Sequence, residues 1–295
     1  MTQVFSGKEV AMALNARLER PITRMKEAGI IPCLAIVRVG DNPDDIAYER
    51  GATARAEKLG VAVEHVGFPG DVCEDELVAG IEKLNRSGNV HGILILRPLP
   101  GHIDDVRVRN AVAAEKDVDG ITDLSAAAVF VNGNGGYPPC TAEACIRMLD
   151  HYGIEIAGKK AVVIGRSTVV GKPVSMMLLH RNATVTICHS KTKDAAAIAR
   201  EADILIVAVG SGGAIGKEYF SENQVVIDVG INLDEQGNIC GDIDAKVAEP
   251  FDRTCCCRYF LRRFTSCSYF ITTMIVILIT TLSRTNRNHD DNDTM

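Results

Sequence analysis

The chain lacks the surplus of positive charge that is typical of proteins that bind nucleic acids. Its 295 residues carry 32 Lys and Arg against 38 Asp and Glu, a net charge of −6 at pH 7. Through residue 250 the basic residues are scattered and form no cluster. A nucleic acid is therefore not an expected partner, because its binding depends on a basic face.

The chain also lacks cysteines at paired spacing. Metal sites and disulfide frameworks use recurring short spacings between cysteines, and a chain of this length can bury a core without disulfides. We expect no metal site and interpret the dispersed cysteines as free thiols in a reducing cytoplasm. These cysteines are Cys33, Cys73, Cys140, Cys145, Cys188 and Cys240.

No segment has the length and composition of a membrane anchor. The opening residues MTQVFSGKEVAMAL contain no basic stretch followed by a long apolar run, so no secretory signal is expected. The apolar segment 269–282 is shorter than the ~20 residues that a membrane-spanning helix needs. It is rich in residues that favour strands, and we interpret it as a segment prone to aggregation. No membrane partner is expected.

What the sequence does contain is a regular alternation of strand and helix patterns. Short apolar runs rich in Val and Ile alternate with helical segments of 10–15 residues, which predicts parallel sheets with right-handed crossovers. The length fits two ordinary domains. We therefore predict an α/β protein of two α/β domains with a boundary near 140–155. Ligands in such folds bind at the carboxyl ends of the strands.

The most informative segment is KKAVVIGRSTVVGKPVSMMLLHRNATVTICHSK, residues 159–191. It reads as a buried strand, a turn at Gly165-Arg166-Ser167, a helix from Val174 to His180 and a second strand. A phosphate at that helix N-terminus would meet free backbone N–H groups and the positive end of the helix dipole. The segment predicts a Rossmann-like dinucleotide site, although Gly165 and Gly171 do not have the usual G-x-G-x-x-G spacing. The alternative is an ordinary strand–helix pair joined by a glycine turn.

The end of the second strand favours one dinucleotide. NAD sites of this type place an Asp or Glu there, which binds the ribose 2′-hydroxyl. Here the strand ends in His189-Ser190-Lys191 without a carboxylate, and Arg166 lies in the turn. A basic pocket suits a 2′-phosphate, so NADP is the predicted cofactor.

Further motifs occur in a fixed order along the chain. They are DDIAYERGATARAEKLG (44–60), GILILRPLPGHID (92–104), KDVDG (116–120), PPCTAE (138–143) and GRSTVVGKP (165–173). Together they resemble the bifunctional methylenetetrahydrofolate dehydrogenase/cyclohydrolase family from about residue 5 to about residue 248. The resemblance implies a cytosolic, homodimeric, NADP-dependent enzyme. It would oxidise 5,10-methylenetetrahydrofolate to the 5,10-methenyl form and hydrolyse that form to 10-formyltetrahydrofolate.

The resemblance also implies substrate-binding residues. Asp119 matches the aspartate that holds the pterin ring, and Tyr48 matches an active-site tyrosine near the one-carbon bridge; both are the predicted catalytic residues. Cys140 and Thr141 match a turn at the domain junction. The alternative roles are a turn aspartate, a half-buried helix aromatic and, for Thr141, a helix N-cap.

Five positions match the family's cofactor contacts. Ile231 matches a backbone contact to the nicotinamide side, whereas His189 is interpreted as a surface histidine at a strand end. The matching positions are Gly165, Arg166, Ser167, Ser190 and Ile231.

The sequence departs from the family at a position tied to hydrolysis. The family has a lysine four residues after the tyrosine, credited with proton transfer in the cyclohydrolase reaction. Here that position is Ala52, and the downstream spacing to Gly60 excludes a shift of register. Arg55 shares the helix face, but arginine stays protonated and is a poor acid or base. We expect weakened cyclohydrolase activity.

A second departure concerns the substrate loop. The family's glutamine is replaced by Leu96, with Arg97 beside it. Both are predicted substrate-binding residues, and Arg97 could contact a carboxylate, orient the substrate or simply be solvated.

The third departure is the C-terminal segment. After about Glu249 the family continues with a Pro-Val-Pro-Gly-Gly-Val-Gly loop and a Thr-rich helix, which this sequence does not match. The change looks like a shifted reading frame or a sequencing error. Cys255-Cys256-Cys257 lack the spaced partners of a metal site. The predicted organisation is a tetrahydrofolate-binding domain at 1–140, an NADP-binding domain at 141–250 and an aberrant tail at 251–295.

Two other interpretations stay open at this point. One is a non-catalytic relic that keeps the nucleotide fold but has lost activity. The other is a different two-domain NADP oxidoreductase, such as a shikimate-type dehydrogenase, against which the KDVDG and PPCTAE segments argue.

Overall fold

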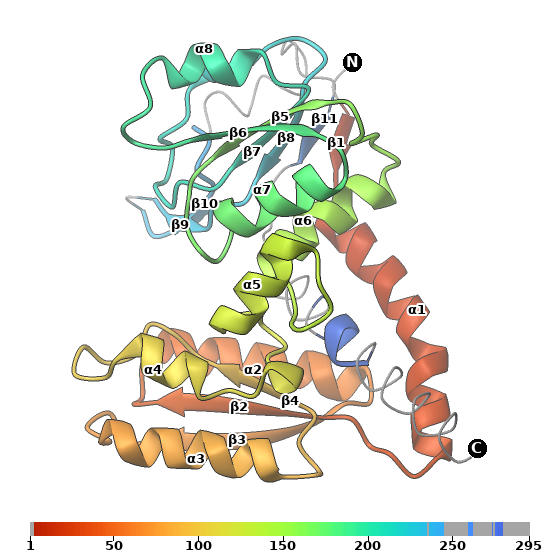
Figure 1. Ribbon diagram of the computed structural model, residues 1–295, viewed down its shortest axis with the longest axis vertical. Coiled ribbons are helices and arrows are strands. Elements are labelled where there is room, and N and C mark those ends of the chain that lie inside the picture. Colours follow the sequence, from red (N-terminus) through yellow and green to blue (C-terminus); the bar gives the residue numbers. More distant parts are fainter. Residues whose placement is uncertain (1–2, 235, 245–258, 262–272, 274, 280–295) are drawn as a thin grey trace. The chain divides into compact units, whose positions relative to one another are not determined.

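Figure 1 shows the protein as a computed structural model. The structure describes residues 3–234, 236–244, 259–261, 273 and 275–279. The chain divides into two compact units, each assembled from two stretches of sequence. We call Ala11–Cys140 with Phe270–Met295 the small-sheet unit, and Met1–Val10 with Thr141–Tyr269 the large-sheet unit.

The small-sheet unit is built on three parallel strands in the order β3-β2-β4. All four residues of β4 are buried, as expected of a parallel strand whose two faces are covered. Its elements are β2 (Cys33–Val39), α2 (Pro43–Lys58), β3 (Ala62–Phe68), α3 (Glu74–Arg86), β4 (Gly92–Ile95), α4 (Asp105–Asn110), η1 (Ala114–Lys116) and α5 (Asp123–Val131).

The large-sheet unit contains a six-stranded parallel sheet in the order β1-β11-β8-β7-β5-β6. Its strands β5, β7 and β8 are buried almost throughout and form the core. Its elements are β1 (Gln3–Phe5), α6 (Cys140–His151), β5 (Lys160–Ile164), α7 (Gly171–His180), β6 (Thr184–Cys188), α8 (Ala195–Arg200), β7 (Ile204–Val207), η2 (Lys217–Tyr219), β8 (Val225–Asp228), β9 (Asn232–Leu233), β10 (Ile239–Cys240) and β11 (Tyr259–Leu261).

The N-terminal residues are fixed to the large-sheet unit before α1 (Gly7–Glu27) proceeds into the other unit. The Ser6 backbone nitrogen donates to the Tyr152 hydroxyl at 2.8 Å, and that hydroxyl donates to the Ser6 carbonyl at 3.0 Å. A tyrosine at the end of α6 therefore holds the start of α1.

The predicted α/β class with parallel sheets is confirmed, and the strand predicted at 160–164 has those bounds. Helix α4 is short, because Asp104 caps its start and the chain turns after Asn110, where the Ala113 backbone nitrogen donates to the Asn85 side chain. The N-cap role considered for Thr141 is wrong, since α6 begins at Cys140 and Thr141 lies in its first turn.

The segment predicted to favour strands, 269–282, is helical where the structure describes it. Thr273 and Ile275 to Ile279 are helical and buried. A Cβ at Gly92 of β4 would lie 3.0 Å from the Leu278 side chain, so this segment packs against the small sheet. Packing on all sides outweighs the modest helix propensity of Ile and Val. The three consecutive cysteines of the tail lie outside the described residues.

Among the helices of the described part, none is both long enough and apolar enough to cross a membrane.

Candidate functional site

The KDVDG segment forms a turn held by a buried carboxylate. Asp117 is fully buried, and its two oxygens accept hydrogen bonds from the backbone nitrogens of Ile121 and Thr122, each at 2.9 Å. The Ser125 hydroxyl donates to the same carboxylate at 2.6 Å. Asp117 thereby fixes the backbone that follows Asp119. The Lys116 ammonium donates to three backbone carbonyls at the end of α3, which is a structural role.

The KDVDG segment is in direct contact with the start of the PPCTAE segment, within the small-sheet unit. Gly120 has φ +67°, and a Cβ there would lie 2.5–2.6 Å from backbone atoms of residues 137–139. The buried Cys140 thiol donates to the Val118 carbonyl at 3.1 Å. The structure therefore brings together two of the predicted substrate-binding residues, Asp119 and Cys140.

The electrostatic surroundings of Asp119 are unusual for a turn aspartate. The pKa of its carboxyl is raised to about 7, mainly by burial and then by the charge of the neighbouring Asp117. A hydrogen bond with Cys140 and the charge of Arg97 act in the opposite direction. A perturbed carboxyl among polar groups is a candidate for function, because structural turn carboxylates are usually solvated and ionised.

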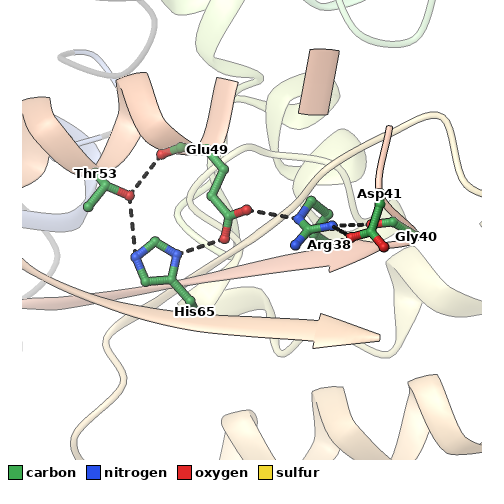
Figure 2. Close-up of polar contacts among 6 residues, drawn as sticks. All are labelled: Arg38, Gly40, Asp41, Glu49, Thr53 and His65. Carbon is green, nitrogen blue, oxygen red and sulfur yellow. Dashed lines mark hydrogen bonds and ion pairs between the residues drawn. The ribbon is translucent and has the colours of Figure 1, made fainter. Parts of the chain in front are cut away.

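Tyr48 lies half-buried on the second turn of α2, a helix that is firmly attached to the sheet. Figure 2 shows Glu49 between Arg38 of β2 and His65 of β3. Its carboxylate contacts Arg38 Nε at 2.9 Å and His65 Nδ1 at 2.7 Å. Burial tends to raise the pKa of Glu49, but the bonds to His65 and Arg38 outweigh it and leave this pKa lowered.

The same network reaches the loop before α2. The Arg38 guanidinium also binds Asp41 at 2.7 Å and the carbonyl of Gly40 (Figure 2). Asn42 then caps α2, accepting a hydrogen bond from the Asp44 backbone nitrogen at 3.0 Å. Because both ends of the strand-to-helix turn are fixed, the helix that carries Tyr48 has a defined position at the carboxyl end of β2.

Ala52 lies one helical turn beyond Tyr48 and is 0% exposed. Its methyl group offers no proton donor or acceptor. The departure from the family noted in the sequence thus falls on a closed position of the same helix.

Leu96 and Arg97 follow β4 and have different environments. Leu96 is buried, and its backbone nitrogen donates to the Val37 carbonyl at 2.9 Å, which extends the ladder to β2. The Arg97 guanidinium binds Asp105 through two hydrogen bonds of 2.6 Å. Arg97 is therefore not simply solvated, and its side chain is oriented by α4.

Thr141 lies half-buried in the first turn of α6, where its carbonyl accepts a hydrogen bond from the Cys145 thiol at 3.3 Å. Burial raises the pKa of Cys145 to about 12, so this thiol does not provide a thiolate near neutral pH.

The turn after β5 depends on glycine at two positions. Gly165 has φ +133°, and a side chain there would collide with the Ala208 carbonyl at the end of β7. A Cβ at Gly171 would collide with the backbone of Gly165 and Arg166. The Ser167 hydroxyl accepts hydrogen bonds from the backbone nitrogens at the start of α7, at 3.1 and 3.4 Å. This tight turn leaves room for a ligand's phosphates close to the backbone.

The turn after β6 is polar and basic. Its exposed side chains include Ser190 and Lys191, and Arg166 in the turn after β5 is exposed as well. The His189 imidazole accepts a hydrogen bond from the Lys191 backbone nitrogen at 3.1 Å. The first carboxylate after β6 is Asp194, which directly precedes α8. The residues present fit a 2′-phosphate better than a bare ribose hydroxyl.

Ile231 is 54% exposed and follows β8. Around it lie two buried aspartates that sequence reasoning missed, Asp228 and Asp242. Their sequence signal is an aspartate within two residues of a glycine in an apolar stretch, IDVG and GDID, which also resembles an ordinary turn. Asp117 was missed for the same reason.

The structure consists of two parallel α/β units. One has a glycine turn that opens a helix, and the other has a carboxyl group with a raised pKa. These features define a nucleotide-dependent two-domain enzyme. Family models agree. The model for the tetrahydrofolate dehydrogenase/cyclohydrolase catalytic domain matches residues 5–119, and the model for the NAD(P)-binding domain of the same family matches residues 139–255. The chain belongs to the tetrahydrofolate dehydrogenase/cyclohydrolase family.

Individual relatives lead to the same assignment. A bifunctional protein FolD of Alkaliphilus oremlandii is 45% identical over 244 residues, which cover 83% of this chain and 86% of the relative. The crystal structure of FolD from Campylobacter jejuni aligns with a TM-score of 0.90 at 32% identity, covering 97% of this chain and 100% of that one. A Trypanosoma brucei FolD structure complexed with NADP and an inhibitor aligns with a TM-score of 0.87 at 29% identity, covering 97% of this chain and 99% of that one.

These matches confirm the predicted family, the fold class and the assignment as an enzyme. They exclude the alternative of a different two-domain oxidoreductase. The structural alignment also extends over more of the chain than the sequence alignment does, 97% against 83%.

Proposed function

We propose that this protein oxidises 5,10-methylenetetrahydrofolate to 5,10-methenyltetrahydrofolate with NADP⁺. Family membership supports the reaction. The observation that carries the proposal is the contact between the Gly120 turn and the segment before Cys140, which gives Asp119 its perturbed environment.

In this proposal the small-sheet unit binds the folate. The ionised carboxylate of Asp119 accepts two N–H bonds from the 2-amino-pyrimidine edge of the pterin. Tyr48 orients the one-carbon bridge from α2, whose position the Glu49 network fixes. Leu96, Arg97, Cys140 and Thr141 are the remaining proposed substrate contacts.

The large-sheet unit binds NADP, the predicted cofactor, which the family's NAD(P)-binding domain supports. NADP⁺ supplies the hydride acceptor. Gly165 and the start of α7 hold the phosphates, with Ser167 shaping the turn. Arg166 and Ser190 face the 2′-phosphate, and the backbone at Ile231 contacts the nicotinamide half. The chain's task is to hold the two rings face to face, because proximity supplies much of the rate.

We further propose that hydrolysis to 10-formyltetrahydrofolate is weakened. The family's hydrolytic step needs a proton donor and acceptor beside the bridge carbon. Ala52 supplies neither, and it is fully buried on the helix that carries Tyr48.

The first experiment is NADP⁺ reduction at 340 nm with 5,10-methylenetetrahydrofolate on the full chain. Reduction that depends on both substrates is the expected result. The Arg166→Ser variant should lose preference for NADP⁺ over NAD⁺ by roughly tenfold, because one charged contact to the 2′-phosphate is removed. A wild-type protein without any reduction, although folded by circular dichroism, would favour the relic interpretation.

The hydrolytic proposal is tested by following loss of 5,10-methenyltetrahydrofolate. We expect slow turnover in the wild type and a gain in the Ala52→Lys variant. Because residue 52 is closed to solvent, thermal unfolding of the variant must be measured beside its activity. Ala54→Lys, at an exposed position of the same helix, is the matched control. A stable Ala52→Lys variant with no gain would contradict the proposal.

The domain roles and assembly are part of the same proposal. We propose residues 1–140 as the tetrahydrofolate-binding domain, residues 141–250 as the NADP-binding domain and 251–295 as the aberrant tail. The compact units differ from these bounds, because residues 1–10 belong to the large-sheet unit and the tail is divided between the two units. We propose a cytoplasmic homodimer, as the family resemblance implies. Light scattering coupled to size exclusion measures the assembly, and a monomeric mass at micromolar concentration would contradict it.

A further inference from the structure

Asp242 uses its whole carboxylate to hold backbone and side-chain donors from two loops. The residue is 0% exposed and lies after β10. One oxygen accepts hydrogen bonds from the backbone nitrogens of Val209 at 2.6 Å and Gly210 at 3.1 Å. The other accepts from the Ser211 backbone nitrogen at 2.9 Å and the Asn232 side chain at 2.9 Å. Four donors meet the roughly four lone-pair sites of a carboxylate.

Asp228 holds Asp242 in turn. One Asp228 oxygen accepts hydrogen bonds from the backbone nitrogens of Gly230 at 3.0 Å and Asp242 at 3.1 Å, and the other accepts from Ile243 at 3.2 Å. A Cβ at Gly230 would collide with the Asp242 carboxylate, and one at Gly241 would collide with that of Asp228. Two glycines therefore make room for two carboxylates.

The loops held in this way end neighbouring strands of the sheet. Residues 209–211 follow β7, residues 230–232 follow β8, and β7 pairs with β8. Ligands of open α/β sheets bind at these carboxyl ends. A side chain at Gly165 would collide with the Ala208 carbonyl, which lies directly before residues 209–211. The phosphate turn and both loops thus form one continuous backbone surface.

Burial and the neighbouring charge both affect the pKa of Asp228. The pKa of Asp228 is raised to about 6. Burial is the main cause and the charge of Asp242 acts in the same direction, whereas the backbone donors at Ile243, Asp242 and Gly230 lower it. Burying two adjacent carboxylates lowers the stability of the fold, because each charge loses its solvation and repels the other. Their seven hydrogen bonds, however, fix the backbone at the carboxyl end of the sheet, where ligands bind.

We propose that Asp242, oriented by Asp228, is a positioning residue that sets the two loops on which the nicotinamide half of NADP rests. This inference rests on the proposed function, in which Ile231 contacts that half of the cofactor. Asp242 itself touches neither substrate. It acts through the backbone of residues 209–211 and 230–232.

The test compares Asp242→Asn with Asp203→Asn. Asparagine at position 242 has about the size of aspartate, but an NH₂ group replaces one of the two carboxylate oxygens. This N–H donor would face the N–H groups that the oxygen binds in the wild type. Asp203 also accepts a backbone hydrogen bond, from the Lys160 nitrogen at 2.8 Å, but at the amino end of the same sheet, where the amide oxygen of asparagine can replace it. Asp203→Asn is therefore a matched control.

NADPH binding by fluorescence titration is the primary readout. We expect Asp242→Asn to raise the dissociation constant of NADPH about 10- to 100-fold, as leaving buried donors unsatisfied implies. The KM for NADP⁺ should rise in parallel while the KM for the folate stays within threefold. Amide hydrogen exchange of residues 209–211 should be faster without any cofactor. Asp203→Asn should behave as the wild type in all three measurements.

The outcomes separate the two proposals. A wild type that does not bind NADPH overturns the proposed cofactor. A wild type that binds, together with an Asp242→Asn variant that binds within twofold of it, overturns the positioning role. If Asp242→Asn does not fold, Asn232→Ala removes one of the four bonds and should still weaken NADPH binding severalfold; unchanged binding there overturns the role as well.

Discussion

The two units differ in what forms their proposed ligand surfaces. In the large-sheet unit the surface is backbone, shaped by Gly165 and Gly171 and held by buried carboxylates behind it. In the small-sheet unit the proposed substrate surface consists of side chains, above all Tyr48 and Asp119, on a helix and a turn that other residues fix.

This difference decides what a substitution can do in each unit. A backbone surface is lost through steric collision, which disturbs folding and binding together. A side-chain surface can lose one reaction and keep the fold, and Ala52 is the natural example, since a closed methyl group occupies the family's lysine position. The proposed function therefore separates dehydrogenation from hydrolysis without a change of architecture.

The largest effect should come from Gly165→Ala. Its Cβ would strike the Ala208 carbonyl, and φ +133° is unfavourable for alanine. We expect a loss of about 3 kcal/mol or more in the free energy of unfolding, measured with urea, and no detectable NADPH binding. Gly158→Ala is the control, because Gly158 has φ +75° but open space around it, and should cost about 1 kcal/mol. Equal losses would mean that the close approach is unimportant.

Leu278→Ala should be next in size. Leu278 is fully buried and lies against Gly92 of β4. Truncating it should lower the free energy of unfolding by about 2–5 kcal/mol. Leu124→Ala, at a 65% exposed position of α5, should change it by less than about 0.5 kcal/mol. A stable Leu278→Ala variant would support the interpretation of the tail as an extraneous segment.

Asp119→Asn should affect catalysis more than stability. Losing charge-assisted hydrogen bonds to the pterin should lower kcat/KM for the folate roughly 10- to 150-fold, from about 1.5–3 kcal/mol. The dissociation constant of NADPH should not change, since the residue belongs to the other unit. Equal losses for both ligands would show instead that the substitution disturbs the whole protein.

The smallest expected effect is the change of kcat/KM and of stability with pH. Because the Asp119 pKa is raised to about 7, kcat/KM for the folate should increase as pH rises through 7 and the carboxyl ionises. The free energy of unfolding should change in the opposite direction. A carboxyl whose pKa is raised on folding stabilises the folded state fully when the pH is below its unfolded pKa near 4, and this stabilisation is lost as the pH rises through 7. Arg97→Leu should shift the activity profile to higher pH, because the Arg97 charge lowers this pKa. A profile that does not move would exclude Asp119 as the titrating group.

Local patterns sufficed to predict much of the fold. The buried strand before Gly165 follows from its apolar run, and the glycine turn follows from Gly165 and Gly171. The pairing of β1 with β11 was not predictable, because strands of three residues carry little periodicity and their partners are far apart in sequence.

The site was predictable only where it resembles a known motif. Asp119 and Cys140 were named from their segments, and the structure adds that these segments touch. Asp117, Asp228 and Asp242 were missed because a turn aspartate and a buried backbone clamp have the same local sequence. Their difference lies in tertiary hydrogen bonds, some to residues more than 30 positions away.

The pairing of the first strand with the last described strand has a consequence for protein synthesis. Residues 3–5 are synthesised about 250 residues before their partner, residues 259–261. At cellular translation speeds the early segment must wait roughly a quarter of a minute to a minute. This edge of the large sheet can therefore form only after residues 259–261 have been synthesised.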